Sequence, residues 1–158
     1  ERCMIRLLGD MRSYNYVVIP IHDFDQVIYK IRAIDFDQQS YEGKFSVYRP
    51  QYFKENKAMM DIVRAKLKTD SITQYKIEER STISRRLIIS DERIKLLLGI
   101  MKDDTVSVKK NVMNLKKEIF KYTNENSFLE CKSMGDLMEK TLKYLKRNYQ
   151  NVSLIDLI

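Results

Sequence analysis

Residues 9–38 read GDMRSYNYVVIPIHDFDQVIYKIRAIDFDQ and carry the strongest strand signals of the chain. Two runs within it, 14–21 and 26–34, are rich in Val, Ile and Tyr, which favour β-strands. The four residues between the runs include two aspartates, which are common in tight connections. Pro20 lies near the end of the first run, where a missing amide donor is best tolerated. The stretch therefore predicts an antiparallel β-hairpin.

From about residue 52 the hydrophobic period becomes helical. Ser90 and Ser133 are predicted N-caps, and Ser133 forms an S-x-x-D capping signal with Asp136. We expect the apolar positions of four helical segments to face one core: Met59, Ile62, Val63, Leu67, Ile94, Leu97, Leu98, Met101, Val108, Val112, Leu115, Ile119, Tyr122, Leu137, Met138, Leu142 and Leu145. The apolar tail, 152–158, carries no cap and is not assigned to an element.

The predicted fold class is α+β, mainly α, with a β-hairpin followed by four or five helices. A chain of 158 residues fits one domain, which we divide into a loop and hairpin region, 1–50, and a helical region, 51–158. No apolar run approaches the roughly 20 residues of a membrane helix, and no signal peptide is evident. Two distant cysteines without metal-ligand spacing are typical of reduced, buried thiols in a cytoplasmic protein.

Acidic and amide side chains flank the predicted hairpin. Asp10 and Asn15 come before its first strand, and Asp35 and Asp37 come after its second. Because an antiparallel hairpin brings its open ends together, we expect these four side chains to converge. Clustered carboxylates repel each other unless a cation compensates them, and oxygen ligands of this type suit Mg²⁺ or Mn²⁺. The sequence therefore predicts a divalent-metal site at the open end of the hairpin.

This pattern resembles the catalytic core of the protein-kinase-like superfamily. An Asp, an Asn five residues later, two strands and an aliphatic-Asp-Phe segment follow one another within 9–38. The Gly9-Asp10 opening and the 34–37 segment are more similar to atypical members, namely HipA-like toxin kinases, aminoglycoside and choline kinase relatives, and lipid kinases. Asp37 stands where protein kinases have the Gly of Asp-Phe-Gly, and the gap from Asn15 to Asp35 is longer than in ordinary protein kinases.

The resemblance implies a role for each residue. Asp10 would orient the substrate hydroxyl and accept its proton, and Arg12 would neutralise charge on the transferred phosphoryl group. Asn15 and Asp35 would bind the cofactors, Mg²⁺ or Mn²⁺ and ATP, with Asp37 as a further metal ligand. The implied function is ATP-dependent phosphotransfer to a hydroxyl-bearing substrate, which the sequence does not identify.

The resemblance also implies a partner. Four scattered glycines cannot form a glycine-rich phosphate loop, and only eight residues precede Gly9. We expect this chain to be the C-terminal lobe of a longer protein, to lack its N-terminal nucleotide-binding lobe, and to be inactive alone. Apolar surface left by the missing lobe would favour self-association.

Three other interpretations fit the same residues. The aspartates could simply be turn residues that flank strands. The lobe could be a pseudokinase that only binds. The net charge of +7, which arises mostly after residue 60, could instead mark a helical module that contacts nucleic acid or an acidic partner. Its candidate surface comprises Lys109, Lys110, Lys116, Lys117, Lys143, Lys146 and Arg147.

Overall fold

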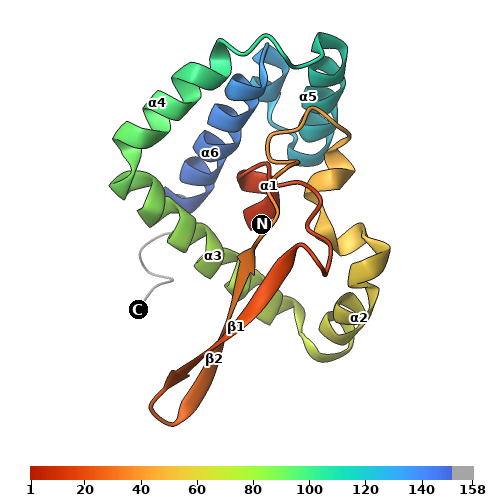
Figure 1. Cartoon of the computed structure of the whole chain (residues 1–158), viewed down its shortest axis with the longest axis vertical. Helices are drawn as coiled ribbons and strands as arrows, with labels where there is room; N and C mark the ends of the chain where they lie inside the picture. Colours follow the sequence, from red (N-terminus) through yellow and green to blue (C-terminus); the bar gives the residue numbers. More distant parts are fainter. Residues whose placement is uncertain (151–158) are drawn as a thin grey trace.

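The predicted hairpin is present, and it projects from the helical body (Figure 1). In this computed structural model, which describes residues 1–150, β1 (Tyr16–Asp23) pairs antiparallel with β2 (Gln26–Ala33). The register runs from Tyr16 opposite Ala33 to Asp23 opposite Gln26. β1 begins two residues later than predicted, because the amide of Asn15 donates to the carbonyl of Arg12 and closes a turn before the strand. It also ends two residues later, because pairing continues to Asp23 opposite Gln26.

Helices make up most of the rest of the described chain, so the α+β, mainly helical class is confirmed. They are α1 (Arg2–Ile5), α2 (Lys57–Lys66), α3 (Thr69–Ile89), α4 (Asp91–Lys102), α5 (Lys109–Thr123) and α6 (Met134–Gln150). Single 3₁₀ turns lie at η1 (Phe45–Tyr48), η2 (Pro50–Tyr52), η3 (Lys54–Asn56) and η4 (Asn126–Glu130). The unassigned tail, 152–158, lies outside the described residues.

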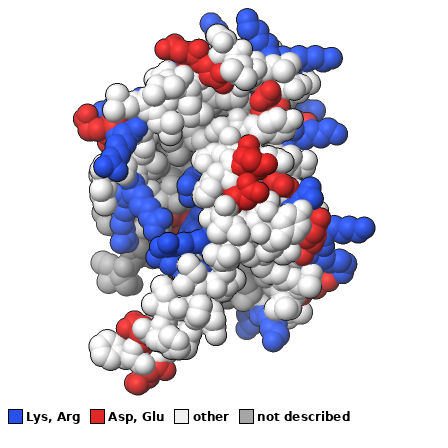
Figure 2. All heavy atoms as spheres, viewed as in Figure 1, with Lys and Arg blue, Asp and Glu red and all other residues white. Residues whose placement is uncertain are grey.

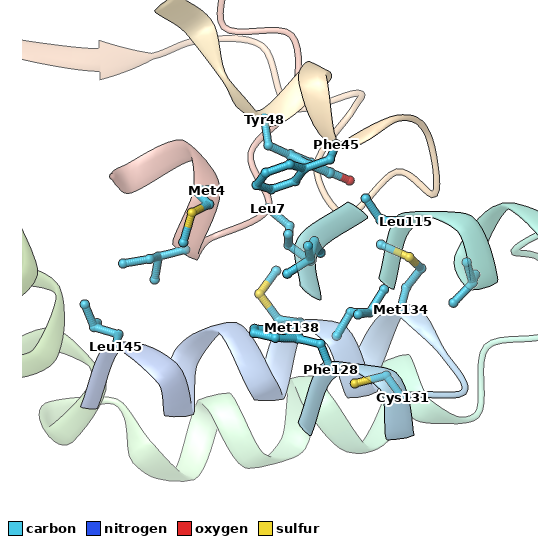
Figure 3. Packing of buried hydrophobic residues seen from close by; sticks show 14 of the residues in the cluster. Met4, Leu7, Phe45, Tyr48, Leu115, Phe128, Cys131, Met134, Met138 and Leu145 are labelled. Carbon is cyan, nitrogen blue, oxygen red and sulfur yellow. The ribbon is translucent and has the colours of Figure 1, made fainter. Parts of the chain in front are cut away.

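The core forms around α6, which packs against α4, α3 and α1. Leu137 and Leu145 of α6 are fully buried, as is Ile119 of α5. Ile5 and Leu7, from the start of the chain, join the same cluster (Figure 3). The hydroxyl of Thr141 donates to the carbonyl of Ile5 at 2.9 Å, which ties α6 to α1. The segment that leads into the residue 9–38 stretch is therefore fixed to the core.

One predicted helix cap is confirmed and the other is wrong. The amide of Asp136 donates to Ser133 Oγ at 3.1 Å, and the Ser133 amide donates back to Asp136 Oδ2 at 3.1 Å. This reciprocal pair is a capping box at the start of α6. Ser90 does precede α4, but its side chain makes no capping hydrogen bond.

The prediction that every apolar stripe faces the core is wrong for α2. None of its residues is buried, and Ile62 remains 58% exposed. Leu97, Val108 and Tyr122, on or beside other helices, are also about half exposed. Periodicity predicts that a helix has an apolar face, but it does not say whether another element covers that face.

The contact between α4 and α6 depends on a glycine and an ion pair. A Cβ on Gly135 would lie 2.7 Å from the backbone nitrogen of Lys102, so no larger residue fits without a shift. Glu139 accepts from Lys102 Nζ and from Lys143 Nζ, each at 2.6 Å. These two hydrogen-bonded ammonium groups lower the pKa of Glu139 to about 2.

Both cysteines of the described chain are free, and Cys131 is buried whereas Cys3 is partly exposed. Burial raises the pKa of the Cys131 thiol to about 11. No described helix combines the length and the apolar character that crossing a bilayer requires.

Candidate functional site

The loop before the hairpin is held against the segment that follows it. The amide of Gly9 donates to the carbonyl of Gln38 at 3.2 Å, and Leu8 forms an isolated bridge with Gln39. A Cβ on Gly9 would lie 2.6 Å from the Gln38 carbonyl oxygen, so the close approach requires glycine. At the hairpin base the Ile34 amide donates to the Asn15 carbonyl at 3.0 Å. Backbone contacts thus bring the predicted site segments together.

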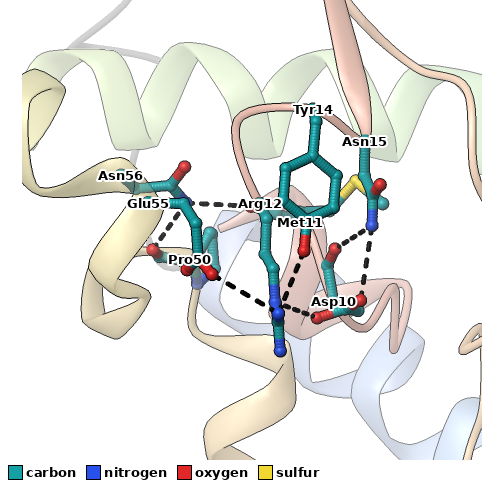
Figure 4. Close-up of polar contacts among 8 residues, drawn as sticks. All are labelled: Asp10, Met11, Arg12, Tyr14, Asn15, Pro50, Glu55 and Asn56. Carbon is teal, nitrogen blue, oxygen red and sulfur yellow. Dashed lines mark hydrogen bonds and ion pairs between the residues drawn. The ribbon is translucent and has the colours of Figure 1, made fainter.

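Asp10 is fixed through both its backbone and its side chain (Figure 4). Its φ of 53° is left-handed, which is uncommon for a residue with a Cβ. Its amide donates to the Val47 carbonyl at 3.0 Å. The buried Asn15 donates from Nδ2 to the Asp10 carbonyl at 2.7 Å and to Oδ2 at 3.4 Å. Since the nitrogen of this amide faces Asp10, its oxygen is the atom that remains for another ligand (Figure 4).

Arg12 lies beside Asp10 instead of extending into solvent. Its Nε is 2.7 Å from Asp10 Oδ1, although the N–H bond is not aligned for a hydrogen bond. Its Nη1 donates to the Tyr14 hydroxyl at 3.0 Å and to Glu55 Oε1 at 3.4 Å. The guanidinium carbon is 5.3 Å from the centre of the Phe53 ring. The hydrogen bond with Tyr14 and the two neighbouring carboxylates raise the pKa of Arg12 further above its ordinary value.

Asp35 and Asp37 are paired after the end of β2. The Asp37 amide donates to Asp35 Oδ1 at 3.1 Å. Desolvation and the negative charge of Asp35 raise the pKa of Asp37, and the charge of Asp10 adds to this effect. Figure 2 shows acidic side chains gathered near the middle of the face that carries these loops. The four side chains expected to converge therefore form two contacting pairs, Asp10 with Asn15 and Asp35 with Asp37, within electrostatic range of each other.

The two pairs are not joined by a side-chain hydrogen bond in the described part of the chain. No hydrogen bond links Asp35 or Asp37 to the side chain of Asn15 or Asp10. Among residues 1–150 no three His, Cys, Asp or Glu side chains are placed as a ready metal-binding group. The oxygen atoms available to a cation here belong to the carboxylates of Asp35 and Asp37 and to the side-chain amide of Asn15. The Asp10 carboxylate is already paired with Arg12.

Asn56 also belongs to the site, although the sequence did not predict a role for it. It is 1% exposed, and its Nδ2 donates to the carbonyls of Met11, at 2.9 Å, and Pro50, at 2.8 Å (Figure 4). It therefore anchors the residue between Asp10 and Arg12 to η2. No motif could have identified it, because the contact spans 45 positions and depends on irregular turns.

One lysine of the alternative basic surface, Lys116, is buried and is not available to a partner. Lys116 is 7% exposed, and its Nζ donates to the carbonyls of Leu129, at 2.7 Å, and Cys131, at 2.9 Å. Its charge therefore holds η4 against α5, and it is not presented to a partner. Lys143 pairs with Glu139, while the side chains of Lys146 and Arg147 lie outside the described residues.

The chain was compared with family models, with curated proteins and with solved structures. No family model, curated protein or solved structure matches this chain.

Proposed function

We propose that this chain is the metal-binding, catalytic-loop lobe of an atypical, kinase-like ATP-dependent phosphotransferase. The observation that carries the proposal is the Asp10 loop. It is locked by Asn15, Arg12 and Asn56, and backbone bonds hold it beside the segment that bears Asp35 and Asp37. Phosphoryl transfer depends mainly on such positioning, together with charge neutralisation.

The charges at this position support a divalent cation. Asp35 and Asp10 both raise the pKa of Asp37, which means that the carboxylates oppose each other's ionisation. A cation such as Mg²⁺ or Mn²⁺ would relieve that repulsion and would accept the free oxygen of Asn15 as a further ligand. In this proposal Asn15, Asp35 and Asp37 hold the ion, which neutralises charge on the nucleotide phosphates when bound.

The other two residues act on the substrate. Asp10 orients the hydroxyl group and receives its proton. Arg12 keeps the Asp10 carboxylate in position through their 2.7 Å ion pair, and it carries a positive charge beside the reacting group. Because Arg12 is also held by Glu55, its first role is to position Asp10.

The exposed hairpin supports the need for a second lobe. Val18, Tyr29 and Ile31 are each at least half exposed although they lie in paired strands. Apolar surface of this kind marks an interface more often than a free face. A nucleotide-binding lobe seated on the hairpin would cover it and would place the phosphates near Asp35.

A metal titration tests the proposal without the second lobe. We expect Mg²⁺ or Mn²⁺ to raise the melting temperature of the wild-type chain and of Asp25→Asn, but not of Asp35→Asn. At ten times its Kd, the ion would stabilise the fold by about 1.4 kcal/mol, or about 3–6 °C. Asn at position 35 can still accept the Asp37 amide, so the substitution changes charge more than structure.

Asp25 is the matched control because it lies at the far end of the same hairpin and receives the same substitution. Equal shifts in all three proteins would show that the ion binds elsewhere, and the proposed metal site would be wrong.

A further inference from the structure

An open groove lies next to the Asp10 loop. It has a volume of about 620 Å³ and lies between residues 41–47 and one side of α5. This volume is within the range of ligand sites. A second hollow of about 390 Å³ adjoins it, shares Ser46, Glu118 and Lys121 with it, and adds Arg49 and Tyr122. The two hollows lie next to each other along α5.

The groove is connected directly to the candidate site. Val47 lines the groove, and its carbonyl accepts the amide of Asp10 at 3.0 Å. The wall of the groove at Val47 is therefore bonded directly to the backbone of Asp10. No other described pocket has a lining residue that bonds to the Asp10 amide.

The cations of the groove are free to bind a ligand. Lys44, Lys117 and Lys121 line it, and none of the three forms an ion pair in the described part of the chain. Arg49, in the adjoining hollow, stacks on Tyr52 at 4.4 Å and so keeps its positive charge at the groove wall.

The carboxylates of the groove are already engaged. Glu118 Oε2 accepts the amide of Phe45 at 2.7 Å, and Glu42 Oε1 accepts the amide of Val108 at 3.1 Å. Both acids thus hold the walls together, and the lining of the groove and the adjoining hollow carries four cations and two carboxylates. The resulting field is positive and attracts anions.

The shape of the groove favours an extended chain over a small molecule. Its α5 side runs from Asn111 to Lys121, which at 1.5 Å per residue is about 15 Å. This length matches four or five residues of extended peptide. The amides of Asn111 and Asn114 can pair with peptide groups, as backbone recognition requires.

We propose that this groove binds an acidic peptide segment, and that the segment presents a Ser or Thr hydroxyl to Asp10. The second part rests on the proposed phosphotransferase function, whereas binding to the groove does not. The hydroxyl-bearing substrate would then be a protein with acidic residues beside its acceptor position.

The test compares two double variants of α5. A fluorescein-labelled peptide of nine residues, rich in Asp and Glu around one Ser, is titrated with the full chain and followed by anisotropy. Lys117→Glu with Lys121→Glu reverses two groove charges. Lys109→Glu with Lys110→Glu makes the same change in net charge on exposed residues outside the groove. We expect the groove variant to bind about tenfold more weakly and the control less than twofold more weakly.

Three results would overturn the inference. Equal losses in both variants would show a response to net charge only. Equal binding of a peptide with Asn and Gln in place of Asp and Glu would remove the role of charge. Tighter binding of a short single-stranded RNA, lost in the groove variant, would assign the groove to nucleic acid.

A fourth protein separates this inference from the proposed function. Asp35→Asn is expected to bind the peptide like wild type, because the measurement contains no metal. Peptide binding by the wild-type chain, together with no rise of its melting temperature in Mg²⁺ or Mn²⁺, would leave the groove standing and would remove the phosphotransferase proposal. Melting curves of both lysine variants establish that they are folded.

Discussion

Asn56 gives the sharpest test of how the Asp10 loop is held. Its side chain is buried, and its Nδ2 is the only side-chain donor described for the carbonyls of Met11 and Pro50. The amide cannot be turned over, because its oxygen would then face two carbonyl oxygens. Asn56→Ala removes both hydrogen bonds and leaves a space behind.

The expected cost follows from these contacts. Each hydrogen bond contributes about 1–1.5 kcal/mol, and a buried carbonyl left without its donor adds to the loss. Because the Met11 carbonyl is buried with Asn56, we expect the free energy of unfolding to fall by about 3 kcal/mol in total. For a chain of this size the melting temperature would drop by about 6–12 °C.

Asn56→Asp is the more discriminating change, because it keeps the shape and replaces the donor with an acceptor. At pH 7 a carboxylate would face two carbonyl oxygens, so we expect a loss larger than that of Asn56→Ala. Protonation restores one donor. The pKa of the introduced carboxyl group would therefore be raised in the folded state. The variant would recover stability at low pH and lose it as pH rises from the unfolded-state pKa through the folded-state pKa.

Thermal and urea denaturation of the variants measure these differences. Asn114→Ala is the control, since Asn114 is exposed on α5 and the substitution favours a helix. A loss below about 1 kcal/mol in Asn56→Ala would show that Asn56 does not hold the Asp10 loop. So would an Asn56→Asp variant as stable as wild type at pH 7.

Three further predictions concern the helical body. Lys116→Met removes the donor for two carbonyls at η4, and it should lower the free energy of unfolding in urea by about 2–4 kcal/mol. Lys117→Met, the control, should cost under about 0.5 kcal/mol. Equal losses would contradict the role of Lys116 as the donor to these two carbonyls. Gly135→Ala should destabilise by about 1–3 kcal/mol because its Cβ meets α4 backbone, and Gly99→Ala, with open space around it, should stabilise by about 0.5–1 kcal/mol in the same melting assay. Glu139→Gln should cost about 1 kcal/mol at pH 7, after allowance for solvent screening of its lysine partners. The folded-state pKa of Glu139 is depressed, so its contribution is present above the ordinary value of 4.5 and should vanish as pH falls toward 2; a difference that persists at pH 2 would contradict this origin.

The sequence predicted the elements whose local signals are strong. The hairpin was predictable because two Val- and Ile-rich runs flank a short acidic connection, and α6 because Ser133 and Asp136 form a capping box. The predicted gathering of four site residues rests on the hairpin, whereas the contact of Asn15 with Asp10 is local, within the loop that precedes β1.

The elements that were not predicted lack such signals. α3 received no prediction of its own, because Ser81 and Ser84 occupy buried positions where an apolar stripe would need larger side chains. The buried role of Lys116 was hidden for a similar reason. A lysine on a helix is usually solvated, and its two carbonyl acceptors come from a turn 13 and 15 positions away.

The Asp10 loop connects the two proposals, because the hairpin leaves it on one side and the peptide groove adjoins it on the other. The register of the hairpin places Val18, Pro20, Tyr29 and Ile31 on one face, and these residues carry no formal charge. A two-stranded hairpin is marginally stable in water by itself, and here the Tyr16 hydroxyl at its base donates to Met59 Sδ of α2 at 3.6 Å. A partner that covered this face would reach the base, where the Ile34 amide bonds to Asn15 and Asp35 follows. The groove proposed to bind an acidic peptide adjoins the Asp10 loop through Val47, and no residue of the hairpin lines it. The nucleotide-bearing partner and the peptide substrate would therefore approach Asp10 from different surfaces. Phosphoryl transfer between two bound molecules requires such an arrangement.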